Sequence, residues 1–228
     1  MAVNFVDKID NRVKVRTVLI SVSNKAGLED FVPKLIQINP EIRILSTGGT
    51  YARIKDILGD AADKHLMQVS DYTGQPETQG GLVKTLDFKI YLGLLTETYN
   101  EDHAADLERT GASQIDMIVV NLYPFAQTIA ADDATVEKAR ANIDIGGPCM
   151  VRASAKNYLR VASVTDPADY PHIIEELASN NGELTLKLRY ELACKAFAHT
   201  AKYDTTIADY LGKADHETVE SCYNFLDE

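Results

Sequence analysis

The stretch that decides the fold runs from residue 15 to residue 50 and contains one pattern twice. Its first part reads Val15-Arg-Thr-Val-Leu-Ile-Ser-Val-Ser-Asn-Lys25, and its second part reads Ile42-Arg-Ile-Leu-Ser-Thr-Gly-Gly-Thr50. Each part is a short, largely apolar run that ends in polar residues, and each precedes a segment with apolar residues at helical spacing. Strand, turn and helix in this order predict an α/β fold, a mostly parallel sheet with helices on both faces.

The chain continues this alternation as far as residue 164. The first helix is expected to bury Leu28, Phe31, Val32 and Leu35, and the second to bury Ile54, Ile57 and Leu58. Further strands are predicted at residues 65–69, 90–95, 116–122 and 161–164. The run at 90–95 is uncharged and mostly apolar, which indicates a central strand buried on both faces.

Residues 184–211 form one long helical pattern without glycine or proline. Its apolar residues recur at spacings of three and four, the helical period, at Leu186, Tyr190, Ala193, Phe197 and Ala201. This segment packs either on the sheet or on a partner subunit. We expect a single domain over residues 1–228, with a core at about 15–212 and an acidic C-terminal tail at 213–228.

Composition excludes several classes of protein. The net charge of −11 argues against a nucleic-acid binder, because an acidic surface repels backbone phosphates. Three cysteines without close pairing indicate a reduced, cytoplasmic protein. The first residues lack the apolar core of a signal peptide, and no apolar run approaches the length of a membrane span.

The two strand ends in the deciding stretch are candidate anion sites. In a parallel sheet both turns emerge at the carboxyl edge, where ligands bind, and the N-termini of the helices that follow offer unpaired N–H groups. Hydroxyl groups, glycines and one lysine surround these turns, at Ser23, Asn24 and Lys25 and at Thr47, Gly48, Gly49 and Thr50. Ordinary capping of two helices is the structural alternative, but two such turns at one edge favour a phosphate site.

Three further segments carry residues suited to chemistry. Residues 79–86 place Lys84 after paired glycines, and residues 121–125 (Asn-Leu-Tyr-Pro-Phe) end the most buried strand. Residues 142–148 (Asn-Ile-Asp-Ile-Gly-Gly-Pro) form a strong turn-to-helix signal, with Asp144 just before it and Lys156 about two turns into the helix. The structural alternatives are a solvated loop lysine for Lys84, a packed side chain for Tyr123 and a surface charge for Lys156. The five histidines do not cluster, and no metal-ligand pattern occurs.

These motifs, in this order, resemble the cyclohydrolase domain of the bifunctional purine-biosynthesis enzyme that also carries formyltransferase activity. The resemblance covers about residues 17–211. It rests also on Val-Ser-Asp-Tyr-Thr-Gly at 69–74, Val-Lys-Thr-Leu at 83–86, Arg-Ala-Ser-Ala-Lys-Asn at 152–157 and Lys-Ala-Phe-Ala-His-Thr-Ala-Lys-Tyr-Asp at 195–204.

The resemblance implies a methylglyoxal-synthase-like fold, a homodimer and an inosine monophosphate cyclohydrolase. That reaction closes the ring of 5-formamidoimidazole-4-carboxamide ribonucleotide with loss of water, and needs no metal or organic cofactor. The family's phosphate and ribose contacts correspond to Ser23, Asn24, Lys25, Thr47, Gly48, Gly49 and Thr50. Its base-site and catalytic positions correspond to Lys84, Thr85, Asn121, Tyr123, Asp144, Ile145, Gly146, Gly147 and Lys156.

The chemistry suggests roles for the catalytic group. The resemblance implies that Lys156, assisted by Asp144, takes the amide proton and returns one to the departing hydroxyl. Lys84 and Tyr123 would stabilise the developing oxyanion, helped by the amides of Gly146 and Gly147. No nucleic acid or membrane partner is expected.

The chain departs from the family pattern around Lys84. Leu82 stands where the family has arginine, and Asp87, Phe88 and Tyr91 replace parts of its Leu-His-Pro-Lys-Ile-His segment. These changes put local substrate contacts in doubt. The formyltransferase half is not in this sequence, so we expect a separate formyltransferase to supply the substrate.

Two rival readings stay open at this point. A methylglyoxal synthase-type lyase would share the fold and the phosphate turns, although it lacks an obvious counterpart to residues 121–125, to residues 143–147 and to the long helical segment. A non-catalytic purine-nucleotide sensor of the same fold would bind without turnover, and Leu82 and Asp87 are the features that favour it.

Overall fold

A five-stranded parallel sheet forms the centre of the protein. The computed structural model describes residues 5–76 and 84–226. The sheet has the order β4-β3-β2-β5-β6, with strands β2 (Thr17–Val22), β3 (Arg43–Ser46), β4 (Leu66–Gln68), β5 (Met117–Asn121) and β6 (Ala162–Val164). A separate antiparallel pair joins β1 (Arg12–Lys14) to β7 (Glu183–Thr185). The predicted α/β fold with a parallel sheet is therefore confirmed.

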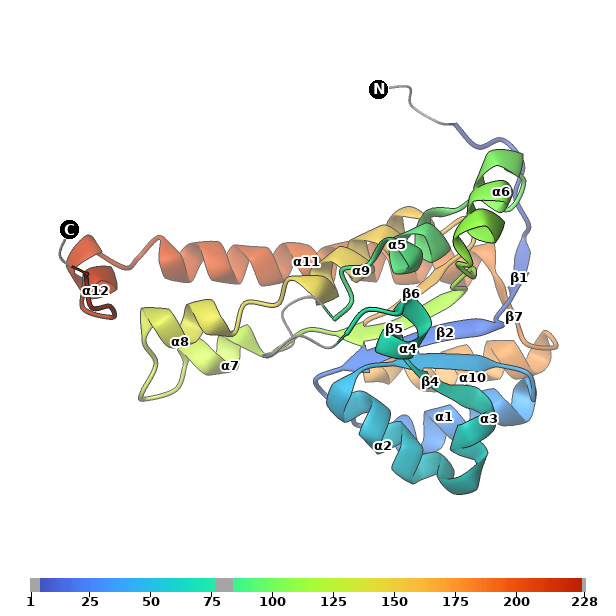
Figure 1. Cartoon of the computed structure of the whole chain (residues 1–228), viewed down its shortest axis with the longest axis horizontal. Coiled ribbons are helices and arrows are strands. Elements are labelled where there is room, and N and C mark those ends of the chain that lie inside the picture. The colour runs from blue at the N-terminus through green and yellow to red at the C-terminus, as the bar shows by residue number, and fades with distance from the viewer. Residues whose placement is uncertain (1–4, 77–83, 227–228) are drawn as a thin grey trace.

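Helices cover both faces of the sheet (Figure 1). Alternate residues of the strands point to opposite faces, so Val18 and Ile20 belong to one core and Leu19 to the other. The first core is closed by α1 (Leu28–Ile38), α2 (Gly48–Leu58) and α10 (Tyr170–Ser179). The second core is closed by α5 (Phe88–Leu95), α9 (Gly146–Lys156) and α11 (Leu186–Leu211).

Shorter helices complete the chain. These are α3 (Ala62–His65), α4 (Val69–Thr73), α6 (Glu101–Thr110), α7 (Phe125–Ile129), α8 (Val136–Ala141) and α12 (His216–Glu220), with 3-10 turns at Gly59–Ala61 and Pro167–Asp169. The acidic tail thus contains a helix, α12, whose N-terminus is capped by Asp215. Among the described residues, no helix is both long enough and apolar enough to span a bilayer.

The strand order decides where a ligand can bind. The chain adds β3 and then β4 on one side of β2, and adds β5 and then β6 on the other. The order therefore reverses between β2 and β5, where Val22 pairs with Asn121 at the carboxyl edge. In parallel α/β sheets the crevice at such a reversal is the usual ligand site.

The predicted strand at residues 90–95 is wrong. This run lies in α5, whose N-terminus is capped by Asp87: the carboxylate accepts a hydrogen bond of 2.8 Å from the Lys89 N–H. A short apolar run has no periodicity that separates a buried strand from a buried helix. Gly93 explains why α5 fits closely, since a Cβ there would lie 2.5 Å from the Ser113 carbonyl oxygen. The strand predicted at 65–69 is shorter, because His65 ends α3 and Val69 begins α4.

The long C-terminal helix is confirmed, but most of its predicted apolar stripe does not pack on the sheet, so packing on a partner subunit stays the open alternative for it. Tyr190 and Phe197 are exposed, and of the predicted stripe only Ala193 is buried. The buried face instead contains Leu188, Arg189, Leu192, Ala193, Ala196, Thr200 and Tyr203. A charged residue in that face broke the apolar pattern: the buried guanidinium of Arg189 donates to five backbone carbonyls, those of Asp10, Asn11, Tyr158, Leu159 and Leu184.

A second buried cation holds the edge of the sheet opposite the ligand edge. Arg160 is paired with Asp116 at 3.1 Å and also donates to the carbonyls of Gly93, Thr96 and Ile115. The Asp116 carboxylate accepts the N–H groups of Arg16 and Thr17 at 2.8 and 3.0 Å. This network joins β2, β5 and the end of α9 at one point.

Candidate active site

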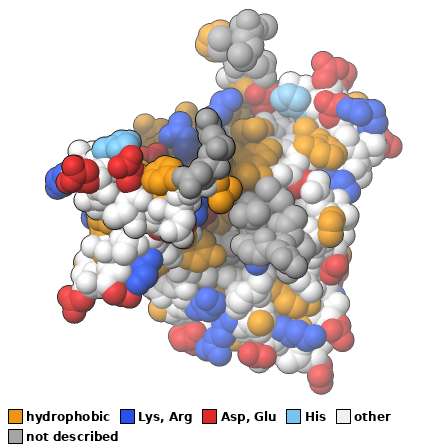
Figure 2. Space-filling view, turned by 60° about the vertical axis from the view of Figure 1, so that its left-hand side comes forward, with side chains coloured by type: hydrophobic (Ala, Val, Ile, Leu, Met, Phe, Trp, Pro, Cys, Tyr) orange, Lys and Arg blue, Asp and Glu red, His pale blue; other side chains and the backbone are white. Residues whose placement is uncertain are grey.

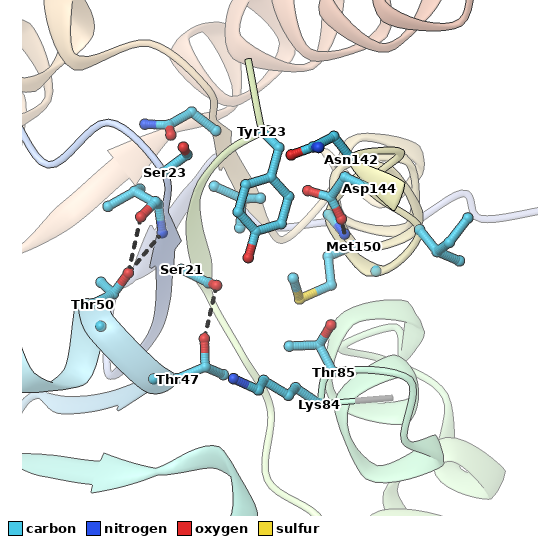
Figure 3. Close-up of a pocket in the computed structure, with 18 of the residues that line it drawn as sticks. Ser21, Ser23, Thr47, Thr50, Lys84, Thr85, Tyr123, Asn142, Asp144 and Met150 are labelled. Atoms are coloured by element: carbon cyan, nitrogen blue, oxygen red, sulfur yellow. Dashed lines mark hydrogen bonds between the residues drawn. The ribbon is translucent and has the colours of Figure 1, made fainter. Parts of the chain in front are cut away.

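A cavity of about 450 Å³ opens at the carboxyl edge of β2, β3 and β5 (Figure 3). The turns after these strands form one side, and the segment from Ala141 into α9 forms the other. The space-filling view shows a hollow in the molecular surface, with apolar side chains in its depth and charged side chains mostly around the outline (Figure 2). The cavity is large enough for a small ligand.

Nearly all of the predicted site residues line this one cavity. They are Ser23, Lys25, Thr47, Gly48, Gly49, Thr50, Lys84, Thr85, Asn121, Tyr123, Asp144, Ile145, Gly146 and Gly147. Segments that are far apart in the sequence are thus brought together by the order of the strands. Asn24 and Lys156 are the two predicted residues that do not line the cavity.

Two lysines converge on the N-terminus of α2. A Cβ on Gly48 would lie 3.3 Å from the Lys84 ammonium nitrogen, and a Cβ on Gly49 would lie 3.9 Å from Cε of Lys25. Gly48 has a φ of +45°, a left-handed conformation that favours glycine. Unpaired N–H groups of the first helical turn and two nearby ammonium groups give this end of the cavity the features expected of the predicted anion site, although the chain as a whole is acidic.

Hydroxyl groups tie the two strand ends together beneath this anion site. The hydroxyls of Ser21 and Thr47 lie 2.9 Å apart in a hydrogen bond. The Thr50 hydroxyl accepts the N–H of Val22 at 3.1 Å and donates to the carbonyl of the same residue at 3.0 Å. Thr50 therefore acts mainly by docking α2 onto β2, since its hydroxyl is already engaged by the backbone.

Asn121 has a similar role for the first turn. Its side-chain oxygen accepts the Asn24 N–H at 2.8 Å, and its amide group donates to the Asn24 carbonyl at 2.9 Å. The Asn24 side chain in turn accepts the N–H of Ala26. Both asparagines therefore shape the turn that carries Ser23 and Lys25, whereas the sequence predicted direct substrate contacts for them.

The opposite side of the cavity is built around two glycines at the start of α9. A Cβ on Gly146 would lie 2.4 Å from the Thr85 hydroxyl oxygen. A Cβ on Gly147 would lie 2.4 Å from Oδ2 of Asp144 and 2.7 Å from Cδ2 of Leu122. Alanine at either position would force these neighbouring side chains to shift, because real Cβ atoms do not approach other atoms so closely.

Asp144 is held at the N-terminus of α9. One of its carboxylate oxygens accepts the Gly147 N–H at 2.9 Å, and its own N–H donates to the Tyr203 hydroxyl at 2.8 Å. Burial raises the pKa of the Asp144 carboxyl, while hydrogen bonds from the backbone N–H groups of Gly147 and Tyr123 oppose the rise. A carboxylate of raised pKa is a better proton acceptor near neutral pH.

Tyr123 and Ile145 present exposed surface at the cavity. Tyr123 is 58% exposed, and its ring projects into the middle of the cavity toward Ser21 (Figure 3). Ile145 is equally exposed. An aromatic ring and an aliphatic side chain beside a polar cleft suit a planar heterocycle.

Lys156 lies away from this cavity. It is the last residue of α9, whose first residue lines the cavity, so it is about 15 Å further along the helix axis at 1.5 Å per residue. Its side chain is exposed. The sequence already placed Lys156 about two turns into the helix, and its pairing with Asp144 rested on the family resemblance. Within one chain, the geometry does not support a proton relay between Lys156 and Asp144.

The described residues that depart from the family pattern, Asp87, Phe88 and Tyr91, do not line the cavity. Asp87 caps α5 and Phe88 is exposed. Tyr91 lies on α5, where burial raises its pKa. Leu82 and residues 79–81 and 83 lie outside the described residues.

Several residues that line the cavity were not predicted as site residues. They are Ser21, Val22, Leu86, Val120, Ala141, Asn142, Ile143 and Met150. Met150 follows Gly146 and Gly147 at helical spacing, which could have indicated that it shares their face. Ser21, Val22, Asn142 and Ile143 lie within the segments already singled out, next to predicted site residues. Leu86, Val120 and Ala141 had no such signal.

Comparison with known proteins decides the family. The family model described as "MGS-like domain" matches residues 27–149. The chain belongs to the MGS-like domain family. A second family model, "AICARFT/IMPCHase bienzyme", matches residues 154–226. The adjoining ends of the two matches fall inside α9 of this MGS-like chain, so they do not mark a boundary in the fold.

The relatives of this MGS-like chain are proteins of purine biosynthesis. It is 49% identical over 197 residues to the "Bifunctional purine biosynthesis protein PurH" of Neisseria gonorrhoeae, covering 86% of this chain and 36% of the relative. The protein of the same name from Neisseria meningitidis is 48% identical over the same length. The chain therefore spans about a third of the length of these relatives.

A solved structure confirms the architecture of this MGS-like chain. The structure titled "Crystal structure of ForH" matches with a TM-score of 0.69 at 30% identity, and the match covers 85% of this chain and 97% of that one. Among the described residues, no group of three or more His, Cys, Asp or Glu side chains is placed to hold a metal ion.

Proposed function

We propose that this chain is an inosine monophosphate cyclohydrolase. The observation that carries the proposal is the division of the cavity into two ends. Two lysines and the N-terminus of α2 form an anion site at one end, while a half-buried carboxylate, Asp144, lies beside an exposed tyrosine at the other. A nucleotide has the matching division into phosphate and base. The relationship to bifunctional purine biosynthesis proteins supports the same assignment.

The ring closure can be written with these groups. The carboxamide nitrogen of the substrate attacks its formyl carbon, which forms a C–N bond and a hydroxyl-bearing tetrahedral centre, and loss of water then gives the ring. Because both reacting groups belong to one molecule, holding them in contact removes much of the entropic cost. The cavity has only to fix the nucleotide and move protons.

Asp144 is the group that we assign to proton transfer. Its carboxylate takes a proton from the attacking amide nitrogen and passes it to the formyl oxygen. It then takes the proton of the former formamide nitrogen and gives it to the hydroxyl, which leaves as water. The raised pKa of this carboxyl suits both taking and giving a proton. The Tyr123 hydroxyl and the Thr85 hydroxyl can donate to the developing oxyanion from opposite sides of the cavity (Figure 3). Lys84 lies toward the anion end, over Gly48, so we assign it to charge neutralisation there.

Ultraviolet absorbance tests the proposal, because closing the purine ring changes the spectrum. We expect the purified chain to convert the formylated carboxamide ribonucleotide to inosine monophosphate, and we expect Asp144→Asn to bind the product but to turn over at least about 100-fold more slowly. Binding without turnover by the parent chain would refute the enzyme and support the nucleotide sensor. Formation of methylglyoxal from a triose phosphate would support the lyase.

The homodimer and the separate formyltransferase stay predictions. The exposed Tyr190 and Phe197 on α11 offer a surface that a second chain could cover. Lys156 can act only in another chain's cavity if it acts at all, because its own cavity is a helix length away. Mixing Lys156→Ala with Asp144→Asn tests this: recovery of activity in the mixture would show that the site spans two chains.

A further inference from the structure

The distal half of α11 extends past the sheet toward the cavity. The helix has 26 residues, and its buried face ends at Tyr203. Beyond that point α11 runs alongside α7, the helix that follows Tyr123 (Figure 1). This half of the helix lines no part of the cavity, but it contacts the two segments that carry Tyr123 and Asp144.

The Tyr203 hydroxyl is bonded to the main chain around Asp144. It accepts the Asp144 N–H at 2.8 Å and lies 3.5 Å from the Asn142 carbonyl oxygen, to which it can donate. Tyr203 is 9% exposed. A buried hydroxyl without partners would cost free energy, and phenylalanine would fill the same space. The hydroxyl therefore serves the segment before α9 and is not needed for packing.

The same helix face holds the segment that carries Tyr123. The ring of Phe125 packs edge-on against Tyr203, with ring centroids 6.2 Å apart, and edge-on against Tyr210 at 6.0 Å. Phe125 is 1% exposed, and its N–H donates to the Tyr123 carbonyl at 2.8 Å. Tyr203 and Tyr210 lie two turns apart on one face, so a single helix positions both segments.

We propose that Tyr203 is a positioning residue for the ring closure, and that it acts by holding the backbone of Asp144 through its hydroxyl group. This inference rests on the proposed function, because Asp144 is the proton-transfer group there. The carboxylate is oriented by the N–H groups of Gly147 and Tyr123, and the Tyr203 hydroxyl fixes the backbone from which that carboxylate extends. Without the hydroxyl, the Asp144 N–H loses its acceptor and the segment must move to find another.

Tyr203→Phe removes only the hydroxyl, and Tyr210→Phe is its matched control. Tyr210 packs on the same Phe125 ring, and its hydroxyl makes no hydrogen bond within residues 5–76 and 84–226. We expect Tyr203→Phe to lower kcat by about 10- to 100-fold with KM within about twofold, because a small misplacement of a catalytic group has effects of this size. Tyr210→Phe should leave both constants within about twofold.

A second readout does not depend on turnover. The ¹³C resonance of the Asp144 carboxyl, assigned as the one lost in Asp144→Asn, gives the pKa of that group by titration. Tyr91 on α5 and Tyr203 on α11, whose pKa values burial raises, face this carboxyl closely enough for its charge to raise them further. In Tyr203→Phe the pKa should rise by about half a pH unit or more, because hydrogen bonds that favour the charged form are loosened. Tyr210→Phe should leave it unchanged.

The outcomes separate this inference from the proposed function. If Tyr203→Phe matches Tyr210→Phe in both kcat and the Asp144 titration, the positioning role is wrong, whether or not the parent chain is active. If the parent chain has no cyclohydrolase activity but the titration still moves only in Tyr203→Phe, the positioning role stands and the proposed reaction falls. A loss of kcat that merely follows a lower folded fraction, with the titration unmoved, also overturns the inference.

Discussion

Substitution of Gly147 by alanine tests whether the close contact between α9 and Asp144 shapes the site. The added Cβ would lie 2.4 Å from Oδ2 of Asp144 and 2.7 Å from Cδ2 of Leu122. Neither atom can yield freely, because Leu122 is 7% exposed within the core and the Asp144 carboxylate is held by the backbone. Overpacking of this kind typically costs about 1–3 kcal/mol of unfolding free energy.

The matched control is Gly49→Ala. Gly49 and Gly147 are each the second residue of a helix at the cavity, α2 and α9 respectively. A Cβ on Gly49 would meet nothing closer than 3.9 Å, an ordinary contact. Alanine there removes backbone freedom from the unfolded chain, so Gly49→Ala should be neutral or more stable by about 0.4–1 kcal/mol.

Thermal and denaturant unfolding, followed by circular dichroism, measure the difference. For a chain of this size each kcal/mol moves Tm by about 2–4 °C, so Gly147→Ala should melt roughly 2–12 °C below the parent. Its kcat should also fall, since the displaced carboxylate is the assigned proton-transfer group. If Gly147→Ala is as stable as Gly49→Ala and as active as the parent, the argument from close contact fails.

Substitutions of Asp116, Lys25 and Asp144, with a control at Asp106, test other parts of the structure. Asp116→Asn leaves Arg160 buried without its carboxylate, so it should lower the unfolding free energy measured by denaturant titration by about 3–5 kcal/mol. Its control is Asp106→Asn, which removes an exposed pair with Arg109 and should change that free energy by less than about 1 kcal/mol. Lys25→Ala should weaken binding of inosine monophosphate by about 10- to 100-fold at low salt, and calorimetry should show a smaller effect as ionic strength rises. Because the pKa of Asp144 is raised in the folded state, the stability that its protonated form contributes is present below the unfolded pKa and is lost as pH rises through the folded pKa. Asp144→Asn should therefore have a larger unfolding free energy than the parent at neutral pH, and the difference should shrink in acid. An equal difference at every pH would contradict this.

The order of elements was largely readable from the sequence because local periodicity reflects local burial. The runs at 17–22 and 117–121 are strands, and the helix expected after Lys25 buries its four predicted residues, Leu28, Phe31, Val32 and Leu35. At 90–95 the prediction is wrong because a short apolar run does not distinguish a buried strand from a buried helix. In α11 it is wrong because Arg189, although charged, is buried among backbone carbonyls that accept its hydrogen bonds.

The sequence by itself determined that the chain has a parallel sheet with polar turns at its carboxyl edge, and which residue types those turns carry. Glycine pairs, lysines and Asp144 could be singled out because each has chemistry that is independent of the fold. Only the tertiary structure decided which of them meet. It brought Lys84 over Gly48 and Asp144 against Gly147, and it placed Lys156 at the far end of α9. The reason is that a motif records order along the chain, whereas contact depends on strand order and helix length, which arise only when the layers pack.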